Sequence, residues 1–232
     1  MPQPPPEHTR LGLLNFLLGV DLFELPFPDQ GRSTIFIDVE KGFGEPAIMS
    51  RICGLLAHEI RAAIDDERHL QRPDIILVNG TKAIVAIHHL SEQLQQLGMR
   101  DITCRWMEKK TERGSGSEIR GFLKSHPQRM PIKSGQRVLI FFMVTSPNSN
   151  IRTLIDFIKR SGGIPVGIAV VFNRTELTSQ SYGIPVVSIF SEPDLECVKS
   201  VLEQAVPGVP PIITELPSMQ PVKVELSAKK KG

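Results

Sequence analysis

The sequence is poor in cysteine and lacks any long apolar run. Its three cysteines, Cys53, Cys104 and Cys197, lie far apart and have no CxxC spacing, so they indicate neither a disulfide framework nor a zinc site. No apolar stretch approaches the roughly 20 residues that a membrane-spanning helix requires, and the start, MPQPPPEHTR, has no apolar signal-peptide segment. We therefore expect a cytoplasmic protein with buried free thiols, no metal site and no membrane segment.

Aromatic residues and net charge are also scarce. The one tryptophan, Trp106, is expected to fill core or interface volume. A formal charge of +2 is too small to indicate binding to nucleic acid or to a membrane surface. Only the three lysines at 229–231 are locally basic, and three charges give a weak, salt-sensitive attraction to a phosphate backbone. The hydrophobic content of 41% is enough for the core of one domain.

Strand and helix patterns alternate through the centre of the sequence. Short apolar runs precede segments in which apolar residues recur every three or four positions, as in helices packed on a sheet. This alternation predicts an α/β fold, a mostly parallel central sheet flanked by helices, with a small N-terminal subdomain. The expected helices are residues 11–23, 46–66, 83–98, 151–161 and 192–205, and the expected strands are residues 33–39, 74–78, 101–107, 166–172 and 185–190, with one more strand beginning at Val138.

Composition divides the chain into three expected regions. Residues 1–9 are Pro-rich and polar and are expected to form a disordered leader, and residues 10–206 to form the globular domain. Residues 207–232 are a Pro-rich tail that ends in the lysine run. Within the domain, the polar, Gly-containing stretch 108–136 is too long for an ordinary connection, so we expect a long mobile loop there.

Four short segments, taken in order, match the motifs of a known enzyme family. DQGRSTIFID is similar to SGRxSPxYID, and PDIILVNGTKAIVAI is similar to a strand and pyrophosphate loop, with Lys82 at the position of the motif's lysine. CRWMEKKTERG is similar to RKxxKxHG and keeps its positive charge through Lys109, Lys110 and Arg113. VLIFFMVTSPNSN aligns without a gap to VLIVEDVxTTGGS, the phosphoribosyl diphosphate signature. Over residues 11–199 the chain thus resembles the type I phosphoribosyltransferases, orotate phosphoribosyltransferase in particular, which implies a phosphoribosyltransferase-like fold.

The signature segment departs from the family where the donor binds. In the family two adjacent acids end this strand and hold the ribose hydroxyls and the magnesium shell, whereas this sequence has Phe142 and Met143. Neither side chain can accept a hydrogen bond from a hydroxyl or supply the oxygen ligands that magnesium prefers. The phosphate loop has also changed, and Pro147 within it lacks a backbone N–H. The residues that replace Thr, Thr, Gly, Gly and Ser are Ser146, Pro147, Asn148, Ser149 and Asn150.

These replacements predict the loss of the family's chemistry. Charge-assisted contacts are worth roughly 1.5 to 3 kcal/mol each, so two missing carboxylates forfeit about three decades of affinity for the donor. We therefore expect no catalytic residue, no cofactor and no ordinary magnesium-dependent reaction. The remaining candidates for ligand binding are Lys82, Lys109, Lys110, Arg113, Ser146, Asn148, Ser149 and Asn150.

Three functions stay open as hypotheses. The first is a non-catalytic phosphoribosyltransferase-like protein that binds, regulates or scaffolds a protein or nucleotide partner; it would be a homodimer, because the resembling family usually dimerises. The second is an enzyme with a modified donor site, which needs magnesium and an acid from elsewhere, such as Asp38 or Glu118. The third is a nucleic-acid-binding protein that uses the basic loop and tail together, with an affinity that falls steeply with salt.

Overall fold

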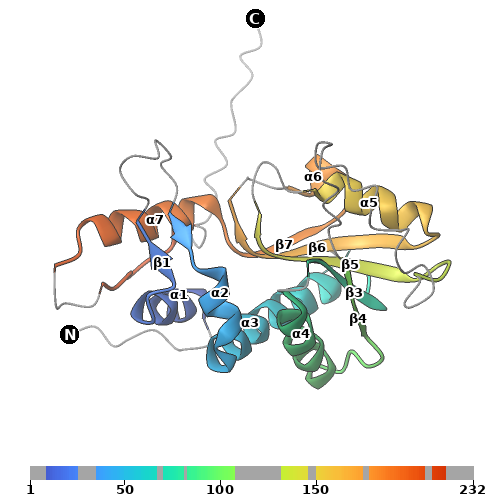
Figure 1. Cartoon of the computed structure of the whole chain (residues 1–232), viewed down its shortest axis with the longest axis horizontal. Coiled ribbons are helices and arrows are strands. Elements are labelled where there is room, and N and C mark those ends of the chain that lie inside the picture. The colour runs from blue at the N-terminus through green and yellow to red at the C-terminus, as the bar shows by residue number, and fades with distance from the viewer. Residues whose placement is uncertain are drawn as a thin grey trace, which may run out of the picture.

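The chain forms one five-stranded sheet with helices around it, and the computed structural model describes residues 9–25, 35–66, 70–80, 83–107, 132–145, 150–174, 178–206 and 211–217. The strand order is β4-β3-β5-β6-β7, and every neighbouring pair is parallel (Figure 1). The predicted α/β class is confirmed, while most of the loop expected at 108–136 lies outside the described residues. The strands are β3 (Ile75–Asn79), β4 (Thr103–Met107), β5 (Arg137–Thr145), β6 (Ile164–Asn173) and β7 (Val186–Phe190).

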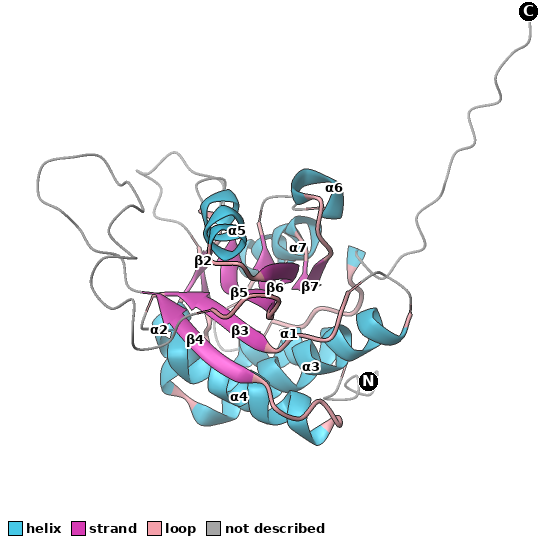
Figure 2. Ribbon diagram, turned by 90° about the vertical axis from the view of Figure 1, so that its right-hand side faces the viewer, coloured by secondary structure: helices cyan, strands magenta, loops and turns pink. Residues whose placement is uncertain are grey.

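Helices cover both faces of the sheet. α3 (Pro46–Asp65) and α4 (Ile84–Gln96) lie on one face, and α5 (Ile151–Arg160) lies on the other (Figure 2). Successive residues of a strand point to opposite faces, so Phe141 of β5 joins the apolar cluster beneath α3 while Ile140 joins the cluster beneath α5. No helix in the described part of the chain is both long and apolar enough to cross a membrane.

The helix ends follow their sequence signals closely. α4 and α5 are each followed by a glycine in the left-handed region, Gly98 at φ +86° and Gly162 at φ +83°, as the pattern predicts. α7 (Glu192–Glu203) begins with a capping box in which the Ser191 backbone N–H and hydroxyl both donate to Asp194 Oδ2, at 2.9 and 2.8 Å. The single-turn helix α6 (Ser179–Tyr182) was not predicted.

The N-terminal subdomain differs in detail from the prediction. It consists of α1 (Arg10–Gly19), the antiparallel pair β1 (Phe23–Glu24) and β2 (Phe36–Ile37), and α2 (Val39–Gly44). The helix expected to reach Phe23 ends at Gly19, because Phe23 instead pairs with Ile37. The strand expected at 33–39 stops at Ile37, because Asp38 caps α2: its Oδ1 accepts the Lys41 backbone N–H at 2.9 Å.

Polar and cation–π contacts fasten α1 to α3. The guanidinium of Arg10 lies 2.9 Å from the Glu59 carboxylate, and the guanidinium of Arg51 lies 4.0 Å from the centre of the Phe16 ring. Beneath them, the apolar side of α1 is buried in the main core, with the side chains of Leu13, Leu14, Leu17 and Leu18. The subdomain is therefore packed on α3, on the face of the sheet that α3 and α4 cover.

A C-terminal segment returns across α1. The Asn15 side chain donates to the Ile213 carbonyl at 2.8 Å and accepts the Ile213 N–H at 2.7 Å. Both backbone groups of Ile213 are therefore bonded to the same side-chain amide. Ile213 and Leu216 are both buried in the core. The tail expected at 207–232 therefore contains a stretch, residues 211–217, that packs on the globular part; residues 218–232 lie outside the described part of the chain.

An ion pair joins the starts of the two central strands. Asp74 precedes β3, and its carboxylate accepts both Nη2 and Nε of Arg137, the first residue of β5, at 2.7 and 3.1 Å. The Arg137 backbone N–H adds a third bond to the same carboxylate at 2.8 Å. These hydrogen bonds lower the pKa of Asp74, and the pair fixes the relative position of β3 and β5.

Candidate functional site

The strand order places a topological switch point between β3 and β5. After β3 the chain crosses through α4 to β4 at one edge, whereas after β5 it passes through α5 toward β6 and β7. The connections that follow these two neighbouring strands therefore diverge to opposite faces of the sheet, and ligands of open α/β sheets bind in the crevice formed there. The expected pyrophosphate and phosphate loops follow β3 and β5 directly, although residues 81–82 and 146–149 lie outside the described residues.

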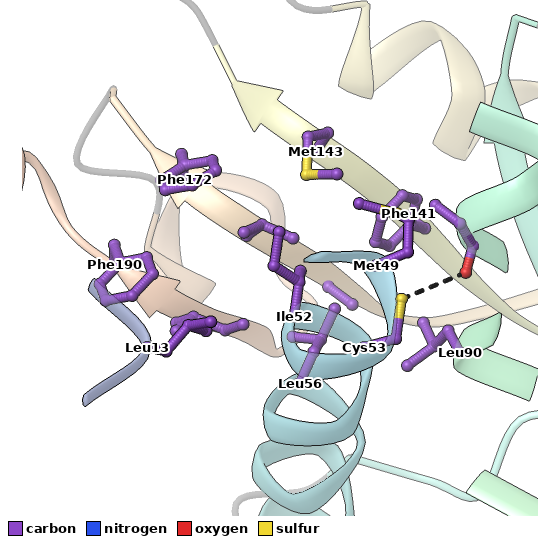
Figure 3. Packing of buried hydrophobic residues seen from close by; sticks show 14 of the residues in the cluster. Leu13, Met49, Ile52, Cys53, Leu56, Leu90, Phe141, Met143, Phe172 and Phe190 are labelled. Carbon is purple, nitrogen blue, oxygen red and sulfur yellow. Dashed lines mark hydrogen bonds between the residues drawn. The ribbon is translucent and has the colours of Figure 1, made fainter. Parts of the chain in front are cut away.

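Met143, the second residue at an acid position of the family, is part of the core. Its side chain is 6% exposed and belongs to the cluster beneath α3. Figure 3 shows Met143 and Phe141 on the side of β5 that faces Met49 and Ile52 of α3. A carboxylate at this position would replace an apolar side chain among apolar neighbours, where an ionised group is strongly disfavoured.

Phe142, at the other acid position, lies on the opposite face. It is half-buried and packs against the cluster beneath α5. β5 thus presents an apolar side chain to each face at the point where the family has acids, and neither side chain can bind a ribose hydroxyl or a divalent cation.

Beyond Met143 the strand ends in a buried polar group that the sequence analysis missed. Thr145 Oγ1 donates to Asn173 Oδ1 at 3.2 Å and accepts the Arg174 backbone N–H at 3.3 Å. Thr145 and Asn173 are opposite each other in the β5–β6 pairing, and both are buried. The signal was present in the sequence as polar residues that end two consecutive apolar runs. This group holds together the ends of β5 and β6, directly before the expected phosphate loop.

The turn after β3 is fixed to the end of β4. The Gly80 N–H donates to the Met107 carbonyl at 2.7 Å, and Gly80 has φ +98°, a backbone conformation that side-chain-bearing residues rarely adopt. α4 begins four residues later, at Ile84. Lys82 falls in the short connection between Gly80 and α4, and it lies outside the described residues.

Of the predicted ligand-binding residues, the structure describes one. Asn150 precedes α5, where its carbonyl accepts the Leu154 N–H at 3.1 Å while its side chain makes no capping bond to the helix. Asp38, a possible substitute acid, already caps α2. The candidates outside the described residues are Lys82, Lys109, Lys110, Arg113, Ser146, Asn148 and Ser149, together with Glu118.

The three cysteines and Trp106 were expected to be buried or to lie at an interface, and they differ in how far the structure buries them. Cys53 is buried, as predicted; its Sγ donates to the Ala86 carbonyl at 3.4 Å (dashed line in Figure 3), and burial raises the pKa of the thiol to about 12. Cys104 and Cys197 are only half-buried. Trp106 is 38% exposed on the edge strand β4, so of the two expected roles it does not fill the core, and the interface role stays a prediction. Among the described residues, no group of three or more His, Cys, Asp or Glu side chains is arranged to hold a metal ion.

Comparison with known proteins gives one curated relative and many similar folds. No family model matches the chain. An alignment of 74 residues is 35% identical to orotate phosphoribosyltransferase of Xylella fastidiosa and covers 27% of this chain and 34% of that protein. The match thus spans about a third of the relative's length.

Solved structures share the fold over most of the chain. UMP synthase of Leishmania donovani matches with a TM-score of 0.53 and 18% identity, over 85% of this chain and 39% of that one. Orotate phosphoribosyltransferase of Francisella tularensis matches with a TM-score of 0.53 and 14% identity, over 83% and 90% of the two chains. That of Aeropyrum pernix gives 0.52 and 15%, over 84% and 99%. The predicted resemblance to the type I phosphoribosyltransferases is confirmed, and the chain has their fold.

Proposed function

We propose that this protein is a non-catalytic relative of orotate phosphoribosyltransferase that serves as a binding, regulatory or scaffold protein. The observation that carries the proposal is the end of β5, where Phe142 and the buried Met143 occupy the acid positions of the family. Catalysis by this fold needs oxygen ligands there for ribose and magnesium, and an aromatic ring and a thioether supply none. A fold that has lost its chemistry remains available for binding, because fold and function separate readily.

Phe142 and Met143 also make it difficult to restore binding of phosphoribosyl diphosphate at this site. Met143 belongs to the core cluster, so an acid introduced there enters apolar surroundings rather than a prepared polar site. Asp38, which could have supplied a carboxylate, caps α2. In the described part of the chain, the polar group nearest in sequence to these positions is the Thr145–Asn173 pair, whose Oγ1 and Oδ1 bond to each other. Donor binding would therefore need a carboxylate other than Asp38.

Calorimetric titration tests this function. Phosphoribosyl diphosphate, with and without magnesium, nucleoside monophosphates and a short single-stranded oligonucleotide are titrated separately into the purified chain. We expect no magnesium-dependent heat from the donor, and heat from another ligand would identify the class of partner. Donor binding that requires magnesium would contradict the proposal.

We also propose that the protein is a cytoplasmic homodimer. Four leucines of α1, at positions 13, 14, 17 and 18, are buried within the chain, so this side of α1 does not offer the dimer contact. The β1–β2 pair instead leaves two large apolar side chains exposed, Leu25 just after β1 and Phe36 in β2. Light scattering at micromolar concentration checks the dimer, and replacing Phe36 by Ser should shift the distribution toward monomer. A wild-type monomer at that concentration would contradict this part of the proposal.

A further inference from the structure

Among the described strands, β4 is the edge of the sheet on the side away from β7. The Thr103 N–H donates to the Asp74 carbonyl at 2.9 Å, and the Met107 carbonyl accepts the Gly80 N–H at 2.7 Å, so the backbone groups of these two residues point toward β3. In a parallel ladder the intervening residues alternate in direction. The N–H and C=O groups of Cys104 and Trp106 therefore point outward, and among the described residues no strand pairs with them.

Arg105 partly closes this edge with its own side chain. Its Nη1 donates to the outward carbonyl of Cys104 at 3.2 Å. Its Nε is buried and has no hydrogen-bond partner. A carboxylate brought to this edge would compete with the Cys104 carbonyl for the Arg105 guanidinium, since hydrogen bonds between charged groups are the stronger ones. It would thereby release that carbonyl for main-chain pairing.

Trp106 supplies an apolar contact on the other face of the same strand. Cys104 Sγ donates to the Ile87 carbonyl of α4 at 3.2 Å, which places residues 104 and 106 on the α4 side and Arg105 on the α5 side. The Trp106 side chain is 38% exposed there. Large aromatic side chains at an exposed edge are frequent anchors of binding surfaces. A strand added to β4 would therefore meet a cation on one face and an indole ring on the other.

Charge decides what kind of strand fits. Suppose that β4 of a second copy paired antiparallel with this strand, so that Cys104 of one copy lay opposite Trp106 of the other. Arg105 would then lie opposite Arg105, and like charges directly opposite each other destabilise a strand pair. An acidic residue at that position would instead form a charge-assisted pair. Self-pairing through β4 is thus disfavoured, and an acidic partner is favoured.

We propose that β4 is a docking edge for an extended acidic peptide of another protein. The peptide adds as a sixth strand through the outward backbone groups of Cys104 and Trp106. One acidic side chain pairs with Arg105, and the apolar residues on either side of that acid lie on the Trp106 face. This is recognition by strand addition, in which main-chain bonds give affinity and alternate side chains give specificity. It uses none of the residues at the end of β5.

The single tryptophan of the chain makes the test direct. The probe is a synthetic peptide, acetyl-Thr-Val-Glu-Val-Thr-amide, titrated into the full chain while Trp106 fluorescence is followed. Two peptides serve as controls, one with lysine in place of the glutamate and one with N-methylated valines that cannot donate main-chain bonds. We expect saturable emission changes with the glutamate peptide, binding weaker by about tenfold or more with the lysine peptide, and no binding of the N-methylated peptide.

A charge reversal in the protein completes the test. Arg105→Glu should prefer the lysine peptide, whereas Arg160→Glu, an equal charge change at the end of α5, should bind like wild type. If Arg105→Glu does not fold, the relative affinities of the wild-type protein for the three peptides still test the proposal. Equal binding of the glutamate and lysine peptides, unchanged affinity after N-methylation, or no binding at millimolar peptide would each overturn the proposal.

Discussion

Restoring one acid of the family at β5 should destabilise this protein, and the effect should depend on pH. Met143 is 6% exposed and lies in the cluster beneath α3. Met143→Asp removes a buried apolar side chain and places a carboxylate in its position. Met143→Asn makes nearly the same change in shape without the charge. The difference between these two variants therefore isolates the cost of burying the ionised group.

The magnitude follows from the surroundings of Met143. Removing the buried side chain costs roughly 2 to 5 kcal/mol in either variant. If burial raises the pKa of the new carboxyl by about 2 above its unfolded value of about 3.9, the aspartate variant loses about 2.7 kcal/mol more at pH 7. Because the folded pKa is the higher one, this extra cost is complete above it and disappears as the pH falls below the unfolded pKa. The two variants should have equal stability near pH 3.5.

Urea denaturation at a series of pH values measures the free energy of unfolding of both variants. We expect the gap to close between pH 7 and pH 4, with Met143→Asn changing no more with pH than wild type does. Equal stability of the two variants at pH 7 would refute the reasoning, because the end of β5 would then accommodate a carboxylate. The replacement of the family's acid could no longer be linked to packing.

Three further predictions concern the framework around the site. Asp74→Asn should lower the free energy of unfolding at pH 7 by up to about 1 kcal/mol, since the ion pair with Arg137 is partly exposed. Because the pKa of Asp74 is lowered in the folded state, this contribution is present above the unfolded pKa and is lost as the pH falls through the folded pKa. Urea titrations of wild type and variant should therefore converge at low pH, and a gap that does not change with pH would contradict the assignment. Asn15→Ala should cost about 1 to 3 kcal/mol by leaving the Ile213 main chain unpaired, and limited proteolysis should cut near residues 211–217 faster than in wild type. Cys53, with a pKa of about 12, should stay unmodified by an aromatic disulfide reagent at pH 8 until the chain unfolds, and native-state modification as fast as that of Cys197 would contradict its burial.

The central sheet was predictable because its signals are local. Apolar runs such as 74–78 and helical periodicity such as that of residues 46–66 lie within single elements, and glycines at 98 and 162 mark the ends of two helices. That the strands of the sheet are parallel then follows from the alternation of strand and helix. The replacement of the acids by Phe142 and Met143 was visible in the sequence alone, since the alignment of that segment has no gap.

Features that depend on distant residues could not be predicted. The two-residue strands β1 and β2 are too short to show periodicity, and Phe23 joins a strand only because Ile37 lies beside it. The contact of Asn15 with Ile213 joins residues 198 positions apart. The exposure of Trp106 follows from the position of β4 at an edge of the sheet, and local sequence does not distinguish edge strands from central ones. Burial of Met143 required the packing of α3 against β5.

The most direct test of the proposal that this protein is not catalytic is release of pyrophosphate from phosphoribosyl diphosphate. The full chain is incubated with the donor, magnesium and either orotate, adenine or another purine base, and pyrophosphate is measured over hours against a reaction without protein. We expect the same release of pyrophosphate with and without protein for every base. Magnesium-dependent release that scales with protein concentration would contradict the proposal.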